Sequence, residues 1–273
     1  MATLTVNGST TYQTISGVGS NVNSWSWKGG EITPALDLLV DTLGHNIFRV
    51  VHDRMTWAGT GSTRPAATLT GLASRDPSTL IQRYETSDMQ DLWSTIAYLN
   101  GKGVTGDQII VNFMGWTAAW MGGSDGYGTP SAITNNAQTN QDAATMLASL
   151  VYYGHHRGDI NASFSNLSFG YLGPFNECDW NGLEGPTITT SQLNTIYTNI
   201  INTLATMGDT TTKLAGPDTA QWPEPYSSVF SAWVLARMTH IGWHSYGGNT
   251  NPSQSQGGVP ADWLSETAVS CPG

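Results

Sequence analysis

Basic residues are scarce in this chain of 273 residues: ten lysines and arginines stand against twenty aspartates and glutamates, giving a formal net charge of −10. Binding to nucleic acid or to an anionic membrane needs a cationic surface that neutralises phosphates, so this balance argues against both partners. Hydrophobic runs longer than a single β-strand are absent, which excludes a membrane-spanning helix. Two cysteines are too few for a disulfide scaffold or a cysteine-rich zinc module.

The polar part of the sequence consists mainly of uncharged side chains. Charged residues make up 11% of the chain, while glycine occurs 31 times and tryptophan 11 times. Few charges and many hydroxyl and amide groups are typical of an extracellular protein that handles neutral ligands. The first residues contain no basic segment followed by a long apolar run, so no signal peptide is visible. We expect an extracellular protein whose export signal has been removed; an intracellular protein is the alternative.

Strand-like and helix-like segments alternate along the chain. Apolar runs bounded by turn residues predict strands, and apolar residues at helical spacing predict helices. The expected strands are residues 3–6, 12–18, 46–52, 108–114, 167–175, 213–217, 239–246 and 259–265, and the expected helices are residues 33–43, 89–99, 143–153, 193–204 and 226–238. This order indicates about seven βα units with a mostly parallel sheet.

Two α/β architectures fit this alternation: a doubly wound sheet and a (β/α)8 barrel. Neither GxGxxG nor GxxxxGK[ST] follows a strand, which excludes the dinucleotide and P-loop interpretations. Polar and aromatic residues fall just past the carboxyl ends of the expected strands, and in a barrel those ends share the face that carries the chemistry. These residues are Asn21, Trp57, Trp116, Glu177, Asp218, Tyr246 and Glu266.

Glutamate is rare, with six in the chain, and Glu177 and Glu266 both end apolar strand-like runs. Burying an unpaired carboxylate is costly, so a carboxylate at such a place needs a reason. Glycoside hydrolysis supplies one, because it needs a carboxylic acid to protonate the leaving oxygen and a carboxylate to attack C1 or to activate water. The alternative is structural: the carboxylates pair with arginines, and Arg49 could serve one of them. Spacing alone leaves both interpretations open.

Six short sequence motifs resemble motifs of glycoside hydrolase family 30, a member of clan A, and occur in the same order along the chain. They are QTISGVG at residues 13–19, NIFR at 46–49, WTAAWM at 116–121, LGPFNE at 172–177, HSY at 244–246 and WLSE at 263–266. The fourth motif resembles the strand-4 Asn-Glu motif of the clan, and the last motif is similar to the clan's strand-7 nucleophile segment. Two residues depart from the family motifs: Ser16 stands where the family has Asp, and Ala118 stands where it has Pro.

The resemblance implies a TIM-type (β/α)8 barrel, of which about seven βα units are visible here. Residues 12–273 are then the catalytic barrel domain, and residues 1–11 form an N-terminal strand that belongs to the family's β-sandwich or to the bottom of the barrel. The last βα unit and the β-sandwich domain are not found in the sequence. An open barrel leaves unpaired strand edges, so we expect poor stability of this segment alone and an opportunity for self-association through those edges.

The resemblance also implies a retaining β-glycosidase, acting in endo or exo mode on a β-linked polysaccharide or oligosaccharide by double displacement. Glu177 is then the general acid/base and Glu266 the nucleophile. Xylan, β-1,6-glucan and β-1,6-galactan are the substrate classes left open, and we expect no cofactor and no metal. The expected substrate-binding residues are Asn176, Arg49, Trp116, Trp120, His244, Tyr246 and Trp180.

A carbohydrate-binding protein without turnover is the alternative function, since the tryptophans and the polar surface suit sugar binding equally well. The glutamate pair separates the two functions, because a binding module has no use for two opposed carboxylates. Cys178 and Cys271 follow the two glutamates along the chain. A disulfide between them and two separate buried thiols both remain open.

Overall fold

The computed structural model describes residues 17–126, 131–180, 184–220, 229–238, 240–245 and 261–267. Five parallel strands pair in chain order in one sheet, and a further parallel pair forms a second sheet. The first sheet contains β1 (Gly19–Asn23), β2 (Ile47–Met55), β3 (Ile109–Thr117), β4 (Tyr171–Gly173) and β5 (Lys213–Leu214), and the second contains β6 (His240–Ser245) and β7 (Ala261–Thr267). The expected parallel sheet is confirmed, whereas the described residues do not make up a complete barrel.

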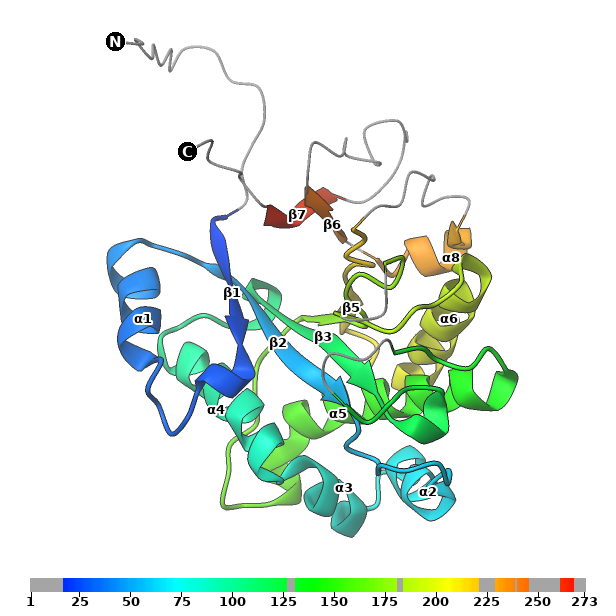
Figure 1. Ribbon diagram of the computed structural model, residues 1–273. Coiled ribbons are helices and arrows are strands. Elements are labelled where there is room, and N and C mark those ends of the chain that lie inside the picture. Colours follow the sequence, from blue (N-terminus) through cyan, green and yellow to red (C-terminus); the bar gives the residue numbers. More distant parts are fainter. Residues whose placement is uncertain are drawn as a thin grey trace.

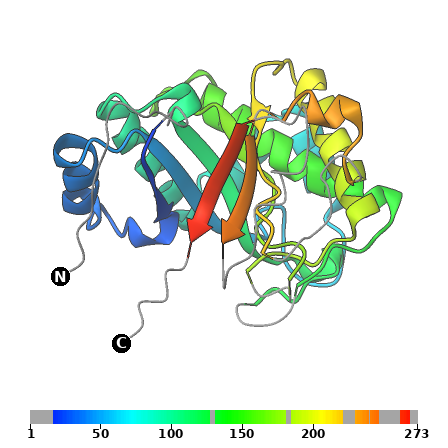
Figure 2. The same ribbon diagram turned by 90° about the horizontal axis from the view of Figure 1, so that it is seen from above.

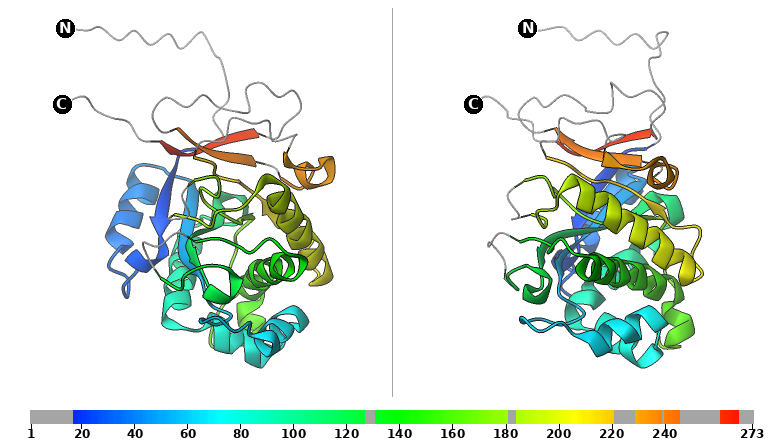
Figure 3. Two further views of the ribbon diagram at one scale, coloured as in Figure 1. Left: turned by 45° about the vertical axis from the view of Figure 1, so that its right-hand side comes forward. Right: turned by 90° about the vertical axis from the view of Figure 1, so that its right-hand side faces the viewer.

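Helices connect the strands and pack around the sheet (Figures 1 and 3). They are α1 (Thr33–Asp37), continued by the π-helical turn η2 (Leu38–Thr42), α2 (Ala66–Ser74), α3 (Pro77–Tyr84), α4 (Ser87–Gly101), α5 (Ala137–Ile160), α6 (Thr190–Thr206) and α8 (Ala232–Leu235). Short 3-10 turns are η1 (Ser24–Ser26), η3 (Gly106–Gln108) and η4 (Ala119–Met121). Within the described ranges, no helix has the length and apolar character that a membrane crossing requires.

Among the described residues, one bridge joins β5 to the segment just before β6. Leu214 of β5 pairs in parallel with Met238, which lies just before β6. The backbone N–H of Leu214 also donates to the carbonyl oxygen of Arg237 at 3.2 Å. The strands therefore follow one another in chain order from β1 to β7. Figures 1 and 2 show β6 and β7 on the opposite side of the larger sheet from α3, α4 and α5.

The first strand begins later than the sequence predicts. We expected a strand over residues 12–18, but β1 begins at Gly19, and residues 12–16 lie outside the described part of the chain. Asn21 therefore lies in the middle of β1 and not beyond its carboxyl end. A β-carbon at position 19 would lie 2.3 Å from the carbonyl oxygen of Ile47. Gly19 thus allows β1 to approach β2 closely, where the sequence suggested that it ends a strand.

The larger sheet buries different side chains on its two faces. Val111 of β3 belongs to the main core, together with Trp93 of α4. The preceding residue, Ile110, joins Tyr171 and Ala215 in a small separate cluster. This division follows from the geometry of a strand, whose successive side chains point to opposite faces. The face that carries the small cluster is called the inner face here, and polar residues continue it toward the carboxyl ends of the strands.

His52 on β2 is a buried histidine in a largely apolar setting. Only 3% of its surface is exposed, and its ring lies 5.8 Å from that of Trp57. In the part of the chain that the structure describes, its Nδ1 has no hydrogen-bond partner. Burial lowers the pKa of His52 to about 4, because the charged imidazolium loses its hydration, and the neighbouring Asp53 carboxylate opposes this shift only in part.

We expect His52 to make the protein less stable in mild acid. Between pH 7 and pH 4.5 the unfolded chain binds a proton at His52, whose ordinary pKa is about 6.5, while the folded protein does not. The free energy of unfolding therefore falls by about 2 to 3 kcal/mol through this residue. Urea unfolding of wild type and a His52→Phe variant at both pH values measures the effect. An equal acid-induced loss in the two proteins would show that His52 does not cause it.

Candidate active site

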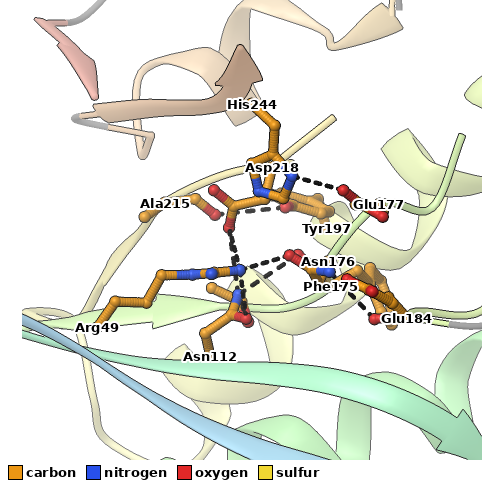
Figure 4. Close-up of polar contacts among 11 residues, drawn as sticks. Arg49, Asn112, Phe175, Asn176, Glu177, Glu184, Tyr197, Ala215, Asp218 and His244 are labelled. Carbon is orange, nitrogen blue, oxygen red and sulfur yellow. Dashed lines mark hydrogen bonds and ion pairs between the residues drawn. The ribbon is translucent and has the colours of Figure 1, made fainter. Parts of the chain in front are cut away.

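Buried polar side chains from five strands, or from the loops that follow them, meet on the inner face of the sheet (Figure 4). Each of them has at most 5% of its surface exposed. They are Arg49 from β2, Asn112 from β3, Asn176 and Glu177 after β4, Asp218 after β5, and His244 from β6. Buried polar groups must find partners, and the carboxyl ends of parallel strands are where α/β folds place their chemistry.

Arg49 on β2 contacts residues of β3 and of the segments that follow β4 and β5. Its Nη2 donates to Oδ1 of Asn112 at 2.9 Å and to Oδ1 of Asn176 at 2.5 Å. The same nitrogen lies 3.6 Å from Oδ2 of Asp218, and both of these charged side chains are 4% exposed. A buried guanidinium is stable only when it is paired and hydrogen-bonded, so the Asp218 carboxylate stabilises Arg49 in this position. The sequence suggested a glutamate as the partner of Arg49, and the carboxylate that the structure describes beside it is an aspartate.

Asn112 also belongs to this network, although it was not among the expected site residues. Its Nδ2 donates to the carbonyl oxygen of Gly173 at 3.0 Å and to Oδ2 of Asp218 at 3.2 Å. Gly173 leaves the room for this amide, because a β-carbon there would lie 2.4 Å from the Asn112 Nδ2. The signal in the sequence is a lone polar residue within the apolar run of β3.

Glu177 follows β4 with its backbone in the left-handed region, at φ 43°. Its backbone N–H donates to the carbonyl oxygen of Asp218 at 2.9 Å, and Asp218 is itself left-handed, at φ 53°. The carboxylate oxygen Oε1 of Glu177 lies 2.7 Å from Nδ1 of His244, and both side chains are buried. Residues other than glycine pay about 1 kcal/mol or more in this backbone region, and such strain is concentrated at functional sites.

Glu266 lies on β7, where the structure describes the backbone. In the parallel pairing of β6 with β7, His244 is directly opposite Glu266, next to a shift in register between Trp243 and His244. The strand position that carries Glu266 is therefore adjacent to the residue that contacts Glu177. The side chain of Glu266, the whole of Tyr246 and the whole of Cys271 lie outside the described residues.

Asn176 is held at both ends of its amide. Its Oδ1 accepts the bond from Arg49, and its Nδ2 donates to the carbonyl oxygen of Glu184 at 3.1 Å. The same carbonyl oxygen accepts the backbone N–H of Gly115 at 3.0 Å. A β-carbon at Gly185 would lie 1.6 Å from the carbonyl oxygen of Asn176, so the loop after Glu177 packs directly against this residue. The orientation of the Asn176 amide is thereby fixed.

The three tryptophans expected to bind sugar have different environments. Trp116 on β3 is half-buried, with the Arg54 guanidinium 5.1 Å from the centre of its ring. Trp120 in η4 is half-buried, and its Nε1 donates to the carbonyl oxygen of Gly59 at 2.8 Å. Trp180 follows the Glu177 loop and is 43% exposed. All three lie on or after β3 and β4, and the contacts described for Trp116 and Trp120 run to Arg54 and Gly59.

Within the described part of the chain, Cys178 next to Glu177 is a buried free thiol. Burial raises the pKa of this thiol, so it stays protonated at neutral pH. Its pairing with Cys271 falls outside the described residues. Among the side chains that the structure describes, no group of three or more His, Cys, Asp or Glu residues is arranged to hold a metal ion.

Neither the models of known protein families nor the curated protein sequences contain a match to this chain. Several solved structures are similar to this chain. The catalytic domain of GH30 xylanase C from Talaromyces cellulolyticus has a TM-score of 0.60 at 19% sequence identity, over 88% of this chain and 55% of that one. A glucosidase from Croceicoccus marinus follows with a TM-score of 0.44 at 14% identity, over 73% and 38%. The modular autolysin LytC from Streptococcus pneumoniae has a TM-score of 0.40 at 11% identity, over 83% and 37%.

The similarity to the xylanase domain shows the fold of the chain. This chain therefore has a glycoside hydrolase-like fold, and it spans about half the length of the xylanase structure. At 19% identity the likeness extends to the architecture and not to the substrate.

Proposed function

We propose that this chain carries the catalytic centre of a retaining β-glycosidase of the family 30 type, with Glu177 as general acid/base and Glu266 as nucleophile. One observation carries the proposal: buried Glu177 is hydrogen-bonded to His244, and His244 lies opposite Glu266 in the β6–β7 register. His244 on β6 thus contacts Glu177, which follows β4, and pairs with the position of Glu266 on β7, on a glycoside hydrolase-like fold. A sugar-binding protein without turnover has no need for this pair.

In the first step, the Glu266 carboxylate attacks C1 of the sugar while Glu177 gives its proton to the leaving oxygen. In the second step, Glu177 takes a proton from water, which attacks C1 and releases the sugar from Glu266. Retention needs carboxyl groups roughly 5–5.5 Å apart, too close for an intervening water. His244 engages Oε1 of Glu177, so Oε2 is the oxygen that exchanges the proton.

Asn176 is suited to recognise the sugar hydroxyl at C2. Arg49 bonds its Oδ1, which identifies the other end of the amide as the donor. One N–H of Nδ2 is given to the carbonyl oxygen of Glu184, and the second can donate to the sugar. Such a bond strengthens as positive charge develops on the ring in the transition state. Arg49 and Tyr246 would in turn hold Glu266 in its ionised form.

The substrate is a β-linked, uncharged glycan outside the cell. Xylan, β-1,6-glucan and β-1,6-galactan are the classes to compare, and the xylanase likeness supports trying xylan first. Trp116, Trp120 and Trp180 would offer aromatic faces to successive sugars.

Reducing-sugar release from the three polysaccharides by wild type and a Glu177→Gln variant tests the proposal. We expect Glu177→Gln to lower kcat by about 10²- to 10⁴-fold on natural linkages, because the leaving oxygen then departs without a proton. On aryl glycosides with an acidic phenol as leaving group, the loss in kcat/KM is much smaller, because the first step then needs no proton. Glu31→Gln, which changes an exposed carboxylate, is the matched control. Binding of these glycans by a wild-type protein that releases no sugar would favour the non-catalytic alternative.

A further inference from the structure

Residues 218–220 follow β5 and hold the loop that carries Glu177 at two points. The backbone N–H of Glu177 donates to the carbonyl oxygen of Asp218 at 2.9 Å. In the opposite direction, the backbone N–H of Ala220 donates to Oδ1 of Asp179 at 2.9 Å. The loop and the segment therefore each donate one bond to the other, and Asp179 provides the side chain in this arrangement.

The same segment also holds β6. The backbone N–H of His244 donates to the carbonyl oxygen of Thr219 at 3.0 Å. His244 is both the side-chain partner of Glu177 and the residue opposite Glu266 in β7. Residues 218–220 thus contact both the loop that carries the proposed acid/base and β6, the strand that pairs with the one carrying the proposed nucleophile. A shift of this segment changes the distance between them.

Backbone strain makes these bonds necessary. Glu177 and Asp218 both have left-handed backbones, at φ 43° and 53°. A conformation that disfavours side chains persists only where surrounding contacts enforce it. Without the acceptor at Asp179, the bond from Ala220 to the Glu177 loop is lost. Both backbones can then relax toward ordinary values and carry the Glu177 carboxylate with them.

We propose that Asp179 is a positioning residue for the acid/base, an inference that rests on the proposed function of Glu177. Asp179 acts through residues 218–220: it fixes this segment against the Glu177 loop, so that Oε2 of Glu177 faces the leaving oxygen. A misplacement of the proton donor by about 1 Å costs about 10²-fold in rate. The bond to Ala220 needs an oxygen acceptor and not a negative charge, so asparagine at this position can replace aspartate.

The test compares Asp179→Ala with Asp179→Asn on aryl β-xylobiosides and aryl β-glucosides whose leaving groups range from 2,4-dinitrophenol to phenol. We expect Asp179→Ala to lower kcat on the phenyl glycosides by about 10- to 100-fold, with KM within about threefold of wild type. Its kcat/KM on the dinitrophenyl glycosides, which reports the first step alone, should change little, because that leaving group departs without a proton. Asp179→Asn should stay close to wild type throughout.

A second measurement does not depend on turnover. The ¹⁵N chemical shifts of the His244 ring report its contact with Glu177, and we expect them to move in Asp179→Ala and not in Asp179→Asn. Equal loss on all leaving groups, or an asparagine variant that behaves like the alanine variant, would overturn the inference. If Glu177→Gln shows no leaving-group dependence, the proposed function fails instead. In that case unchanged His244 shifts in Asp179→Ala would overturn the positioning role as well.

Discussion

Replacing Glu266 with glutamine will lower kcat by at least about 10⁴-fold while the fold survives, because an amide cannot form the glycosyl ester on which double displacement depends. The change is isosteric and lies on β7, whose backbone pairs with β6. Initial rates on dinitrophenyl glycosides measure the loss, and circular dichroism with thermal unfolding verifies the fold. Glu31→Gln again serves as the control for a change of one charge.

The stereochemistry of azide rescue separates the roles of the two glutamates. In Glu266→Ala, azide occupies the vacated space and attacks C1 as the phenolate leaves, which forms a C–N bond with inverted configuration and gives an α-glycosyl azide. In Glu177→Ala, the nucleophile still forms the glycosyl ester, and azide then attacks from the opposite face to give the β-product. Proton NMR distinguishes the two products. A Glu266→Gln enzyme with wild-type activity, or the β-azide from Glu266→Ala, would show that Glu266 is not the nucleophile.

Loss of Arg49 has the largest expected effect on stability. Arg49→Met keeps the length of the side chain but leaves the Asp218 carboxylate buried without the guanidinium beside it. Removing one partner of a buried ion pair typically costs about 3–5 kcal/mol. We expect the free energy of unfolding to fall by about that amount, as measured by urea unfolding followed through tryptophan fluorescence.

The double variant Arg49→Met with Asp218→Asn provides the comparison. Because asparagine carries no charge, the double variant should recover a large part of the stability that Arg49→Met loses. A cost below about 1 kcal/mol for Arg49→Met, or a double variant that loses the sum of the two single changes, would show that the pair does not hold the site together.

The regular spacing of apolar residues predicted those helices and strands that bury side chains at regular intervals. The stripe from Met89 to Leu99 predicted a helix, and α4 buries those positions against the sheet. The helices α2 and α3 went unnoticed, because each is about two turns long and buries only two residues. The start of α3 nevertheless has a local signal: Asp76 accepts the backbone N–H of Thr79, and Pro77 occupies the first turn.

The candidate site was predictable where a single residue carried the signal. Glu177 was predicted because a carboxylate ends an apolar run there. Asn176 was predicted because the sequence motif around it resembles the family motif. Asn112 was missed because its contacts depend on how β3 aligns with its neighbouring strands. It lies opposite Val51 of β2 and Gly173 of β4, and no local sequence pattern predicts that alignment. The role of Asp179 likewise appears only when two loops distant in sequence are seen together.

The backbone at Glu177 also bears on how this protein can be engineered. Its left-handed conformation suits glycine better than glutamate, so the residue proposed to do the chemistry is one that folding by itself disfavours. A laboratory selection for heat resistance alone would therefore enrich inactive glycine substitutions at this position. Screening for thermostable variants needs turnover as a second criterion in every round.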